Sequence, residues 1–393
     1  MSTHGPHEAQ FGLNAAKVRQ GLIVDGILRR TLGPLVRPRG PQPPLAAIDP
    51  KTVLVLYPQL IGDVVLLSGF LCGLRRRYPR THIAVVGQKF LDELLGGQGY
   101  YDAFFEFRCP WRAFDYSAGN LRKMALLLAR LRRRSWDLAI DLRGDLRNIA
   151  FLYATGARYR VALDGTGGDY LLTHPLRAPA TAKHLVESNR FVLEALGGIM
   201  SEPRLAISEA DRTWARQTIT ELVEPGKRIF AIHPGTSRES KHWFPDRFAL
   251  LAEHLEARYG AALLLVLGPA DQALGASILE RSRARLHVVQ PPLGKLPALL
   301  ASCDLLIGLD SAAAHIAGAV GSPALALFGP SDPHVVRPVG QRSHVVIKEG
   351  FACRPCGLGT CPLGVEKSCM FAIQPADVLE GIALLLGSTG DVH

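Results

Sequence analysis

The sequence lacks any run of about 18 residues that is consistently apolar and free of charge, the length from which a membrane-spanning helix can be built. Its first residues also lack the positively charged segment, apolar stretch and cleavage site of a secretion signal. We therefore expect a cytoplasmic protein, which can still lie peripherally on the inner face of the cytoplasmic membrane.

Cysteine and aromatic residues are scarce as well. The seven cysteines among 393 residues are too few and too unevenly spread for a disulfide framework, and Cys72, Cys109 and Cys303 lie in surroundings that suit reduced thiols. Aromatic residues make up 7% of the chain, and none interrupts the arginine runs at residues 75–77 and 132–134. Because nucleic-acid strands are bound by aromatic platforms among basic residues, we expect no nucleic-acid partner.

Acidic charge is in short supply only in the front part of the chain. Residues 1–50 carry 6 basic and 3 acidic side chains, residues 51–200 carry 21 and 13, and residues 201–393 carry 18 and 19. This asymmetry predicts that the front part faces an anionic membrane surface or a phosphorylated glycolipid. A basic surface that only aids solubility is the alternative.

Short apolar runs that alternate with longer helical patterns account for most of the sequence. Such alternation predicts parallel sheets with helices on both faces, here in two doubly wound Rossmann-like α/β domains. The predicted strands are residues 53–57, 83–86, 138–142, 229–233, 263–267, 305–308 and 324–328. The predicted helices are residues 64–78, 118–134, 247–259, 312–320 and 375–387.

The domain boundaries follow from shifts in composition. Residues 51–200 form the first domain, residues 201–227 a helix and linker, and residues 228–393 the second domain. Residues 1–50 are a basic, proline-rich extension. Apolar residues at helical spacing between Val24 and Leu35 predict an amphipathic helix there, which lies on a membrane or packs on the first domain, and Pro34 and later prolines end it.

Three loops at predicted strand ends carry chemically useful residues. Strand 305–308 leads through Asp310 and Ser311 into a small-residue helix, whose first N–H groups are free to bind a phosphate. After strand 53–57, Gly62 permits a tight turn and Asp63 opens a helix, where it is a general base or only an N-cap. After strand 229–233, small residues and Lys241 suit a diphosphate, although a solvated loop is the alternative.

Taken together, these segments resemble glycosyltransferase family 9, the ADP-heptose:lipopolysaccharide heptosyltransferase family. The family has the GT-B fold, in which two Rossmann-like domains face each other across a cleft. The matching segments occur in family order from about residue 52 to residue 385 and are Ile61-Gly62-Asp63-Val64-Val65 with Arg77-Tyr78-Pro79, Asp137 to Leu142, His233-Pro234-Gly235 with Lys241-His242-Trp243, and Asp310-Ser311 with His315 and Leu327-Phe328-Gly329-Pro330.

The resemblance implies inverting, metal-independent transfer of a heptose or related sugar from an ADP-sugar to a lipopolysaccharide core or similar anionic glycolipid. It makes Asp63 the general base and Lys241 the basic residue at the donor phosphates, and it puts Gly62 and Arg143 on the acceptor side. Residues 51–200 become the acceptor-side domain and residues 228–393 the nucleotide-sugar-binding domain. The implied donor-binding residues are His233, Gly235, Thr236, Ser237, Lys241, Asp271 at the adenosine ribose, Asp310, Ser311, Ala312, Ala313 and His315.

Some positions depart from the family pattern. Three alanines, Ala312 to Ala314, replace the Gly-Pro-Met of the family's Asp-Ser-Gly-Pro-Met-His, and Pro58 and Gln59 stand where small hydroxyl residues are common. Another nucleotide sugar, a protein acceptor or a catalytically lapsed nucleotide-sugar binding protein therefore remain as alternatives. The joint presence of Asp63, Lys241 and His315 argues against the lapsed form.

Four of the cysteines form a cluster near the end of the chain. Cys353, Cys356, Cys361 and Cys369 fall within 17 residues, among prolines and glycines that favour turns. Four thiols can hold Zn²⁺ or iron in a closed, structural site, and a protein-glycosylating branch of the family uses similar segments for iron. The spacing is not that of a zinc ribbon, so a reduced, metal-free loop or a labile disulfide is the alternative. No cofactor is expected for catalysis.

Overall fold

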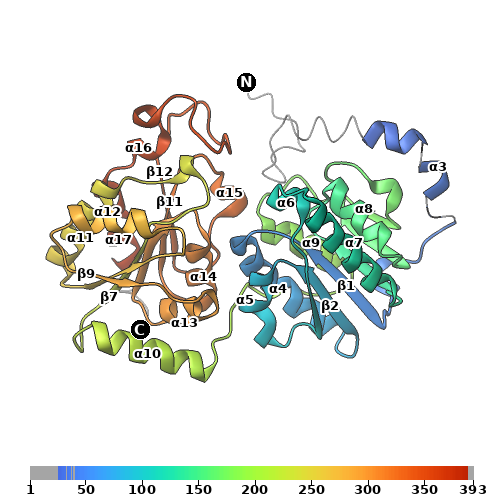
Figure 1. Cartoon of the computed structure of the whole chain (residues 1–393), viewed down its shortest axis with the longest axis horizontal. Coiled ribbons are helices and arrows are strands. Elements are labelled where there is room, and N and C mark those ends of the chain that lie inside the picture. Colours follow the sequence, from blue (N-terminus) through green and yellow to red (C-terminus); the bar gives the residue numbers. More distant parts are fainter. Residues whose placement is uncertain (1–24, 32, 37, 39, 388–393) are drawn as a thin grey trace. The chain divides into compact units, whose positions relative to one another are not determined.

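The structure is a computed structural model that describes residues 25–31, 33–36, 38 and 40–387. The chain divides into two compact units, Met1–Pro203 and Arg204–His393. Each unit is built on a six-stranded parallel sheet with helices on both faces, as the sequence predicts (Figure 1). Among the described helices, none combines the length and the apolar character that crossing a bilayer requires.

The sheet of the first unit has the strand order β3-β2-β1-β4-β5-β6. Its strands are β1 (Thr52–Tyr57), β2 (His82–Gly87), β3 (Ala103–Glu106), β4 (Leu138–Asp141), β5 (Tyr159–Leu163) and β6 (His174–Leu176). Its helices are α3 (Gly33–Val36), α4 (Ile61–Arg77), α5 (Lys89–Leu95), α6 (Pro110–Ala113), α7 (Ala118–Arg132), α8 (Leu146–Ala154) and α9 (Leu185–Ala195), with single 3₁₀ turns at Leu45–Ala47, Gly96–Gln98 and Asp169–Leu171.

The order of the strands reverses between β1 and β4. Leu56 of β1 pairs with Asp141 of β4, so the loops that follow these two strands lie next to each other. The two strands are fully buried beyond Thr52, because helices cover both faces of the sheet. In doubly wound folds this reversal opens a crevice at the carboxyl ends of the strands, where ligands bind.

The second unit repeats this plan with the order β12-β11-β10-β7-β8-β9, and its reversal falls between β7 and β10. Its strands are β7 (Ile229–His233), β8 (Ala262–Val266), β9 (Leu286–Val289), β10 (Leu305–Leu309), β11 (Ala324–Phe328) and β12 (Ser343–Ile347). Its helices are α10 (Glu209–Leu222), α11 (Pro245–Tyr259), α12 (Gln272–Arg281), α13 (Leu296–Ala301), α14 (Ala312–Val320), α15 (Pro333–Val336), α16 (Cys369–Ala372) and α17 (Pro375–Gly387), with 3₁₀ turns at Glu239–Lys241, Leu293–Lys295 and Val365–Lys367.

The predicted linker differs from the structure. Residues from Arg204 onward belong to the second unit, where α10 packs against α13 and the Leu205 N–H donates to the Ala319 carbonyl at 3.1 Å. The segment 201–227 therefore holds a helix that is anchored in the second unit, and only its first residues remain with the first.

The described part of the N-terminal extension packs on the first unit. Residues 25–31 are helical, and the Asp25 carboxylate accepts a hydrogen bond from the Gly168 N–H at 2.7 Å. Arg29 pairs with Asp169 on the same surface. Pro34 does not end α3, because it is the second residue of that helix, in a first turn where its missing N–H is not needed. The rest of the predicted extension, residues 1–24, lies outside the described residues.

Candidate functional site

Asp63 lies at the carboxyl edge of the first sheet, in the first turn of α4. The N-cap of this helix is Leu60, in an extended conformation, and no side chain caps the helix there. The N-cap alternative for Asp63 is therefore wrong. The tight turn predicted at Gly62 is wrong as well, because the chain turns before Ile61 and Gly62 is already helical.

The Asp63 carboxylate has few partners. Its side chain is 16% exposed, and Arg112 Nη2 on α6 lies 3.9 Å from Oδ2. Among the described residues, no N–H or O–H donates a hydrogen bond to it. The Tyr57 hydroxyl instead donates to the Asp63 backbone carbonyl at 3.2 Å. Asp63 is thus positioned by its backbone and by a neighbouring charge, and its carboxylate oxygens can accept a proton from a substrate.

Tyr57, at the end of β1, is the buried group beneath Asp63. Burial first, and then the nearby charge of Asp63, raise the pKa of Tyr57 above its usual range, while the charge of Arg143 lowers it. These interactions place Arg143, predicted on the acceptor side, close to the same strand end. Tyr57 therefore stays a neutral hydroxyl that holds the first turn of α4.

Asp141, at the end of β4, is fully buried beside this edge. Burial raises the pKa of Asp141 to about 7, although hydrogen bonds from the Gly144 N–H at 2.7 Å and from Asn148 Nδ2 at 2.9 Å favour the charged form. Asn148 Oδ1 in turn accepts from Trp111 Nε1 at 3.0 Å. Because Trp111 precedes Arg112 on α6, this chain of hydrogen bonds fixes the helix that faces Asp63.

The sequence analysis missed Arg112, Trp111 and Asn148. They come from two short helices, α6 and α8, that are distant in sequence from Asp63, and only the strand-end position of Asp141 could have pointed to the network.

In the second unit, Lys241 and Asp310 form a close pair. Lys241 Nζ lies 2.5 Å from Asp310 Oδ2, with the two side chains 14% and 7% exposed. Gly308 of β10 pairs with His233 of β7, which brings the loops after these strands together. The Thr236 hydroxyl completes the contact by donating to the Asp310 carbonyl at 3.3 Å. The structure therefore joins three of the predicted donor residues, and Asp310 compensates part of the Lys241 charge.

The start of α14 is left open for a ligand. Ser311 occupies the N-cap position in an extended conformation, but its hydroxyl makes no capping hydrogen bond. Ser311 Oγ is buried and, within the described part of the chain, has no hydrogen-bond partner. Ala312 and Ala313 follow with small side chains, and His315 is buried one turn further on. The first N–H groups of α14 thus keep their capacity to bind an anion.

Asp271 gathers with His233 and Gly235 at the same edge of the second sheet. Asp271 Oδ2 accepts from the Gly268 N–H at 2.8 Å, and its carboxylate lies so close to Gly235 that a Cβ at this position would displace it. Burial lowers the pKa of His233, and the charge of Asp271 only partly offsets this, so the imidazole is neutral at neutral pH. Ser237 is exposed on the loop that follows.

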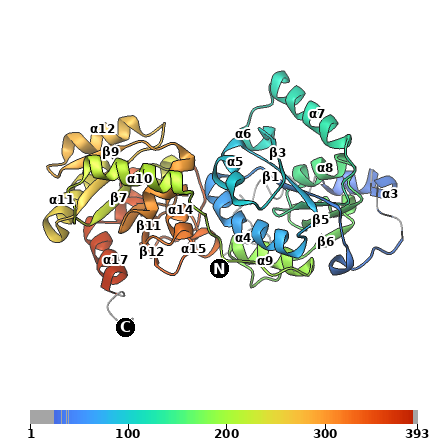
Figure 2. The ribbon, with the colours of Figure 1, turned by 90° about the horizontal axis from the view of Figure 1, so that it is seen from below.

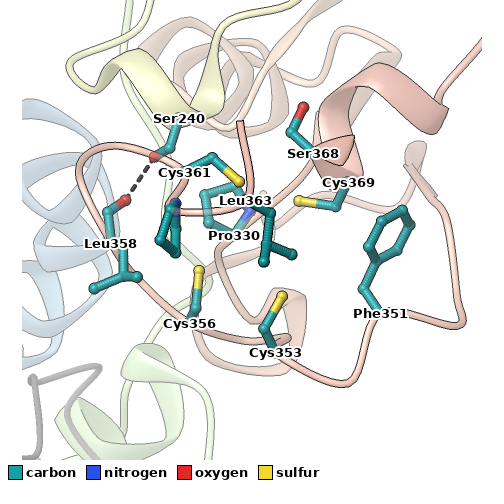
Figure 3. A pocket seen from close by; sticks show the side chains of 11 residues that line it. Ser240, Pro330, Phe351, Cys353, Cys356, Leu358, Cys361, Leu363, Ser368 and Cys369 are labelled. Carbon is teal, nitrogen blue, oxygen red and sulfur yellow. Dashed lines mark hydrogen bonds between the residues drawn. The ribbon is translucent and has the colours of Figure 1, made fainter. Parts of the chain in front are cut away.

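The four clustered cysteines line one small cavity. Figure 3 shows the side chains of Cys353, Cys356, Cys361 and Cys369 directed toward one another. They line a cavity of about 30 Å³, together with Phe351 and Leu363. Burial raises the pKa of the Cys369 thiol, with further contributions from Cys356 and Cys353. In the described part of the chain, no three His, Cys, Asp or Glu side chains are gathered closely enough to hold a metal ion.

The cysteine loop is hydrogen-bonded to the loop that carries Lys241. The Ser240 N–H donates to the Gly359 carbonyl at 2.9 Å, and the Ser240 hydroxyl donates to the Leu358 carbonyl at 2.5 Å (Figure 3). Arg238 Nη1 donates to the Gly357 carbonyl at 2.8 Å. The sequence analysis missed this contact, because 118 residues separate Ser240 from Leu358.

Comparison with known proteins identifies the family. The model of glycosyltransferase family 9 (heptosyltransferase) matches residues 124–365. Lipopolysaccharide heptosyltransferase 3 of Escherichia coli K12 is 27% identical over 289 residues, which cover 70% of this chain and 82% of that protein. The solved glycosyltransferase family 9 structure from Veillonella parvula superposes with a TM-score of 0.72 at 21% identity, over 86% of this chain and 98% of that one.

A second solved structure supports the same fold. The ADP-heptose lipopolysaccharide heptosyltransferase II of E. coli gives a TM-score of 0.67 at 20% identity, over 86% of this chain and all of that chain. Both structures share the pair of Rossmann-like units of the GT-B fold. Because the family model spans more than half of the sequence, the chain belongs to glycosyltransferase family 9, the heptosyltransferases.

Proposed function

We propose that this glycosyltransferase moves a heptose from ADP-heptose to an anionic glycolipid of the lipopolysaccharide core, with inversion at the anomeric carbon and without a metal in the transfer step. Family membership supports the class of sugar. The similar E. coli enzymes are named for lipopolysaccharide and for ADP-heptose, which supports this acceptor and this donor.

The uncapped start of α14 is the observation that carries the donor side. A diphosphate at Ser311 would receive hydrogen bonds from the first N–H groups of α14 and from the Ser311 hydroxyl, which is buried and has no partner among the described residues. An ammonium group has three N–H bonds, so Lys241 can donate to Asp310 and to a phosphate oxygen together. These donors stabilise the negative charge that develops on ADP as it leaves.

Asp63 carries the acceptor side. Its carboxylate takes the proton of the acceptor hydroxyl while that oxygen forms a bond to the anomeric carbon of the heptose. The bond between that carbon and the β-phosphate oxygen breaks on the opposite side, and its electron pair leaves with ADP. Arg112 Nη2 lies 3.9 Å from Asp63 Oδ2 and places a cation beside the proposed base.

For the cysteine cluster we propose a structural role. Four thiols are a suitable donor set for one Zn²⁺ or iron ion, but they line the cavity without being gathered into a coordination sphere, so the loop would have to close around the ion. Held together, they would fix the loop that supports Ser240. No step of the transfer depends on them.

The basic front part of the chain supports a lipid-borne acceptor. Between residues 51 and 200 basic side chains outnumber acidic ones by 21 to 13, which suits an enzyme that works at the anionic inner face of the cytoplasmic membrane.

Product analysis tests the proposed reaction. Lipopolysaccharide from a strain that lacks this protein is incubated with the purified chain and either ADP-heptose or other ADP- and UDP-sugars. We expect mass spectrometry to show the gain of one heptose from ADP-heptose alone, and NMR to show that the anomeric configuration is inverted. Transfer from another nucleotide sugar, or to protein in place of glycolipid, would contradict the proposed donor or acceptor.

A further inference from the structure

Helix α7 covers the first unit with one side and leaves its other side open. Met124, Leu127 and Leu128 pack against the core beneath it, and Asn120 and Leu131 are its only buried residues. In Figure 2 the helix lies on the outside of the first unit, and no other described element of that unit covers its outer side. Ten of its fifteen residues, counted along its whole length, are exposed.

The charges carried by α7 itself all have one sign, although Asp115 in the preceding loop pairs with Arg108 and lies near Lys123. The sequence of α7 contains no aspartate or glutamate, whereas α10 and α11 each carry acidic and basic residues. Four cations on or just after α7 have no ion-pair partner among the described residues: Arg122, Lys123, Arg132 and Arg133. A helix that only met water would have no reason to exclude acidic residues.

Apolar side chains stand among these cations. Leu126 is 60% exposed and Leu121 39%, both on α7. Just before the helix, Phe114 is 73% and Tyr116 57% exposed. Phe114 has φ 52°, a left-handed conformation that is strained for a bulky residue and that keeps its ring on the outside of the unit.

We propose that α7 and the loop at Phe114–Tyr116 dock on an anionic lipid bilayer. A helix that exposes apolar side chains among its cations lies in the interface, with its apolar side chains among the acyl chains and its cations at the phosphates. A nucleic acid would pair with the same cations but would leave Leu121 and Leu126 in water, so the bilayer is the better partner. The inference rests on the proposed lipid-borne acceptor.

The chain connects this surface to the candidate base within the same unit. Helix α6, which carries Arg112, ends one residue before Phe114, and Arg112 lies 3.9 Å from Asp63. Docking through α7 would therefore hold the Asp63 edge of the first unit near the membrane that carries the acceptor.

Vesicle co-sedimentation tests the surface directly. Leu126→Glu is compared with Leu250→Glu, which alters a leucine that is 45% exposed on α11 of the second unit. Arg122→Gln/Lys123→Gln is compared with Arg283→Gln/Arg285→Gln, which removes two exposed arginines of the second unit. On phosphatidylcholine vesicles that contain phosphatidylglycerol, we expect both α7 variants to lose about tenfold or more of their partitioning, and both controls to bind like the unaltered chain.

Several outcomes would overturn the inference. The first is unchanged vesicle binding by both α7 variants. The second is equal binding of the unaltered chain to vesicles of phosphatidylcholine alone. The third is release of the chain from the vesicles by an oligonucleotide that binds α7 in their place. A change of molar mass in Leu126→Glu, measured by light scattering, would make α7 a contact between copies of the chain. Thermal melting of each variant shows whether it is folded. If Leu126→Glu does not fold, Arg122→Gln/Lys123→Gln still tests the surface.

The failure of the proposed function gives a different pattern. With a core oligosaccharide freed of its lipid, we expect the α7 variants to transfer heptose as fast as the unaltered chain. If the unaltered chain, like every variant and control, transferred no heptose but still bound anionic vesicles, the proposed function would fail and the docking surface would stand.

Discussion

The two sheets present charged groups at their carboxyl edges, but they hold these groups in opposite ways. In the first unit, Asp63 lies 3.9 Å from Arg112 and accepts no hydrogen bond from a described residue. In the second unit, Lys241 and Asp310 are 2.5 Å apart and more deeply buried. A proton acceptor must be able to exchange its partner for a substrate, whereas a charge that binds a leaving group must stay in place. In the proposed mechanism this difference matches the two tasks, proton transfer at Asp63 and charge stabilisation at Lys241.

Each edge also rests on a second layer of contacts. Behind Arg112, the hydrogen bond from Asn148 to Asp141 is buried, and the one from Trp111 to Asn148 is partly buried. Behind Lys241, the neighbouring Ser240 is bonded to a partly exposed loop, residues 357–360. The first edge is thus supported by a core, and the second by a loop that lies between Cys356 and Cys361.

The largest effect is expected at Asp63. Asp63→Asn keeps the size of the side chain but cannot take a proton, so kcat should fall by roughly 10² or more while the affinity for ADP stays the same. Steady-state kinetics and ADP titration measure the two quantities. Asp246→Asn, another first-turn carboxylate, in α11, serves as the control and should keep full activity. Near-normal turnover of Asp63→Asn would contradict the assignment of the proton acceptor to the edge of the first sheet.

A smaller kinetic effect, on binding as well as turnover, is expected for Lys241 and Asp310. Lys241→Ala or Asp310→Asn leaves one partner of a buried pair alone, so ADP affinity and turnover should both fall, by roughly tenfold each. The second unit should also lose about 3–5 kcal/mol of stability in each single variant. The double variant should lose less than the sum of the two single losses. Additive losses, by calorimetry and titration, would show that the pair does not act as a unit.

The sequence predicts the centre of each sheet better than its margins. Strands β1, β2, β4, β7, β8, β10 and β11 were predicted because they are mostly buried and so form continuous apolar runs. Strand β5 and the four edge strands β3, β6, β9 and β12 were missed. Strand β6 has three residues and includes Pro175, and β3, β9 and β12 are mostly half-buried or exposed.

The candidate site shows the same limit. The loops at Asp63, Lys241 and Asp310 were predicted because parallel strands place their carboxyl ends together. The contacts of Arg112 with Asp63 and of Ser240 with Leu358 were not, because no local pattern links residues so far apart in the chain. Spacing alone could not show that Gly62 is helical either. A glycine at the start of a helix is compatible both with a turn before the helix and with its first turn, and here α4 already begins at Ile61.

The buried layer of the first edge predicts a pH dependence of stability. The pKa of Asp141 is about 7 in the fold and 3.8 in its ordinary state, so the folded chain binds the extra proton between these values. Its contribution to the free energy of unfolding is full below pH 3.8 and declines as the pH rises to 7, by up to about 1.4 kcal/mol per pH unit. Asp141→Asn should remove this slope in urea unfolding between pH 5 and pH 7, roughly the window set by the two pKa values. Identical slopes in both proteins would mean that Asp141 is ionised in the fold.

The smallest effects are expected at the loop behind Lys241. Chelation by EDTA should leave kcat unchanged, because hydrogen bonds from α14 and Lys241 stabilise the leaving diphosphate.

If the cysteines hold an ion, the chain purified without chelator should contain about one zinc or iron, and Cys356→Ser should lose that ion and melt at a lower temperature. Because the loop bonds to Ser240, Cys356→Ser should also raise the KM for ADP-heptose about twofold to fivefold with little change in kcat, whereas Cys72→Ser, outside the cluster, should change neither. Metal-free protein with an unchanged melting temperature would show that the loop is held by its backbone hydrogen bonds alone, and that both edges of the enzyme are supported without a metal.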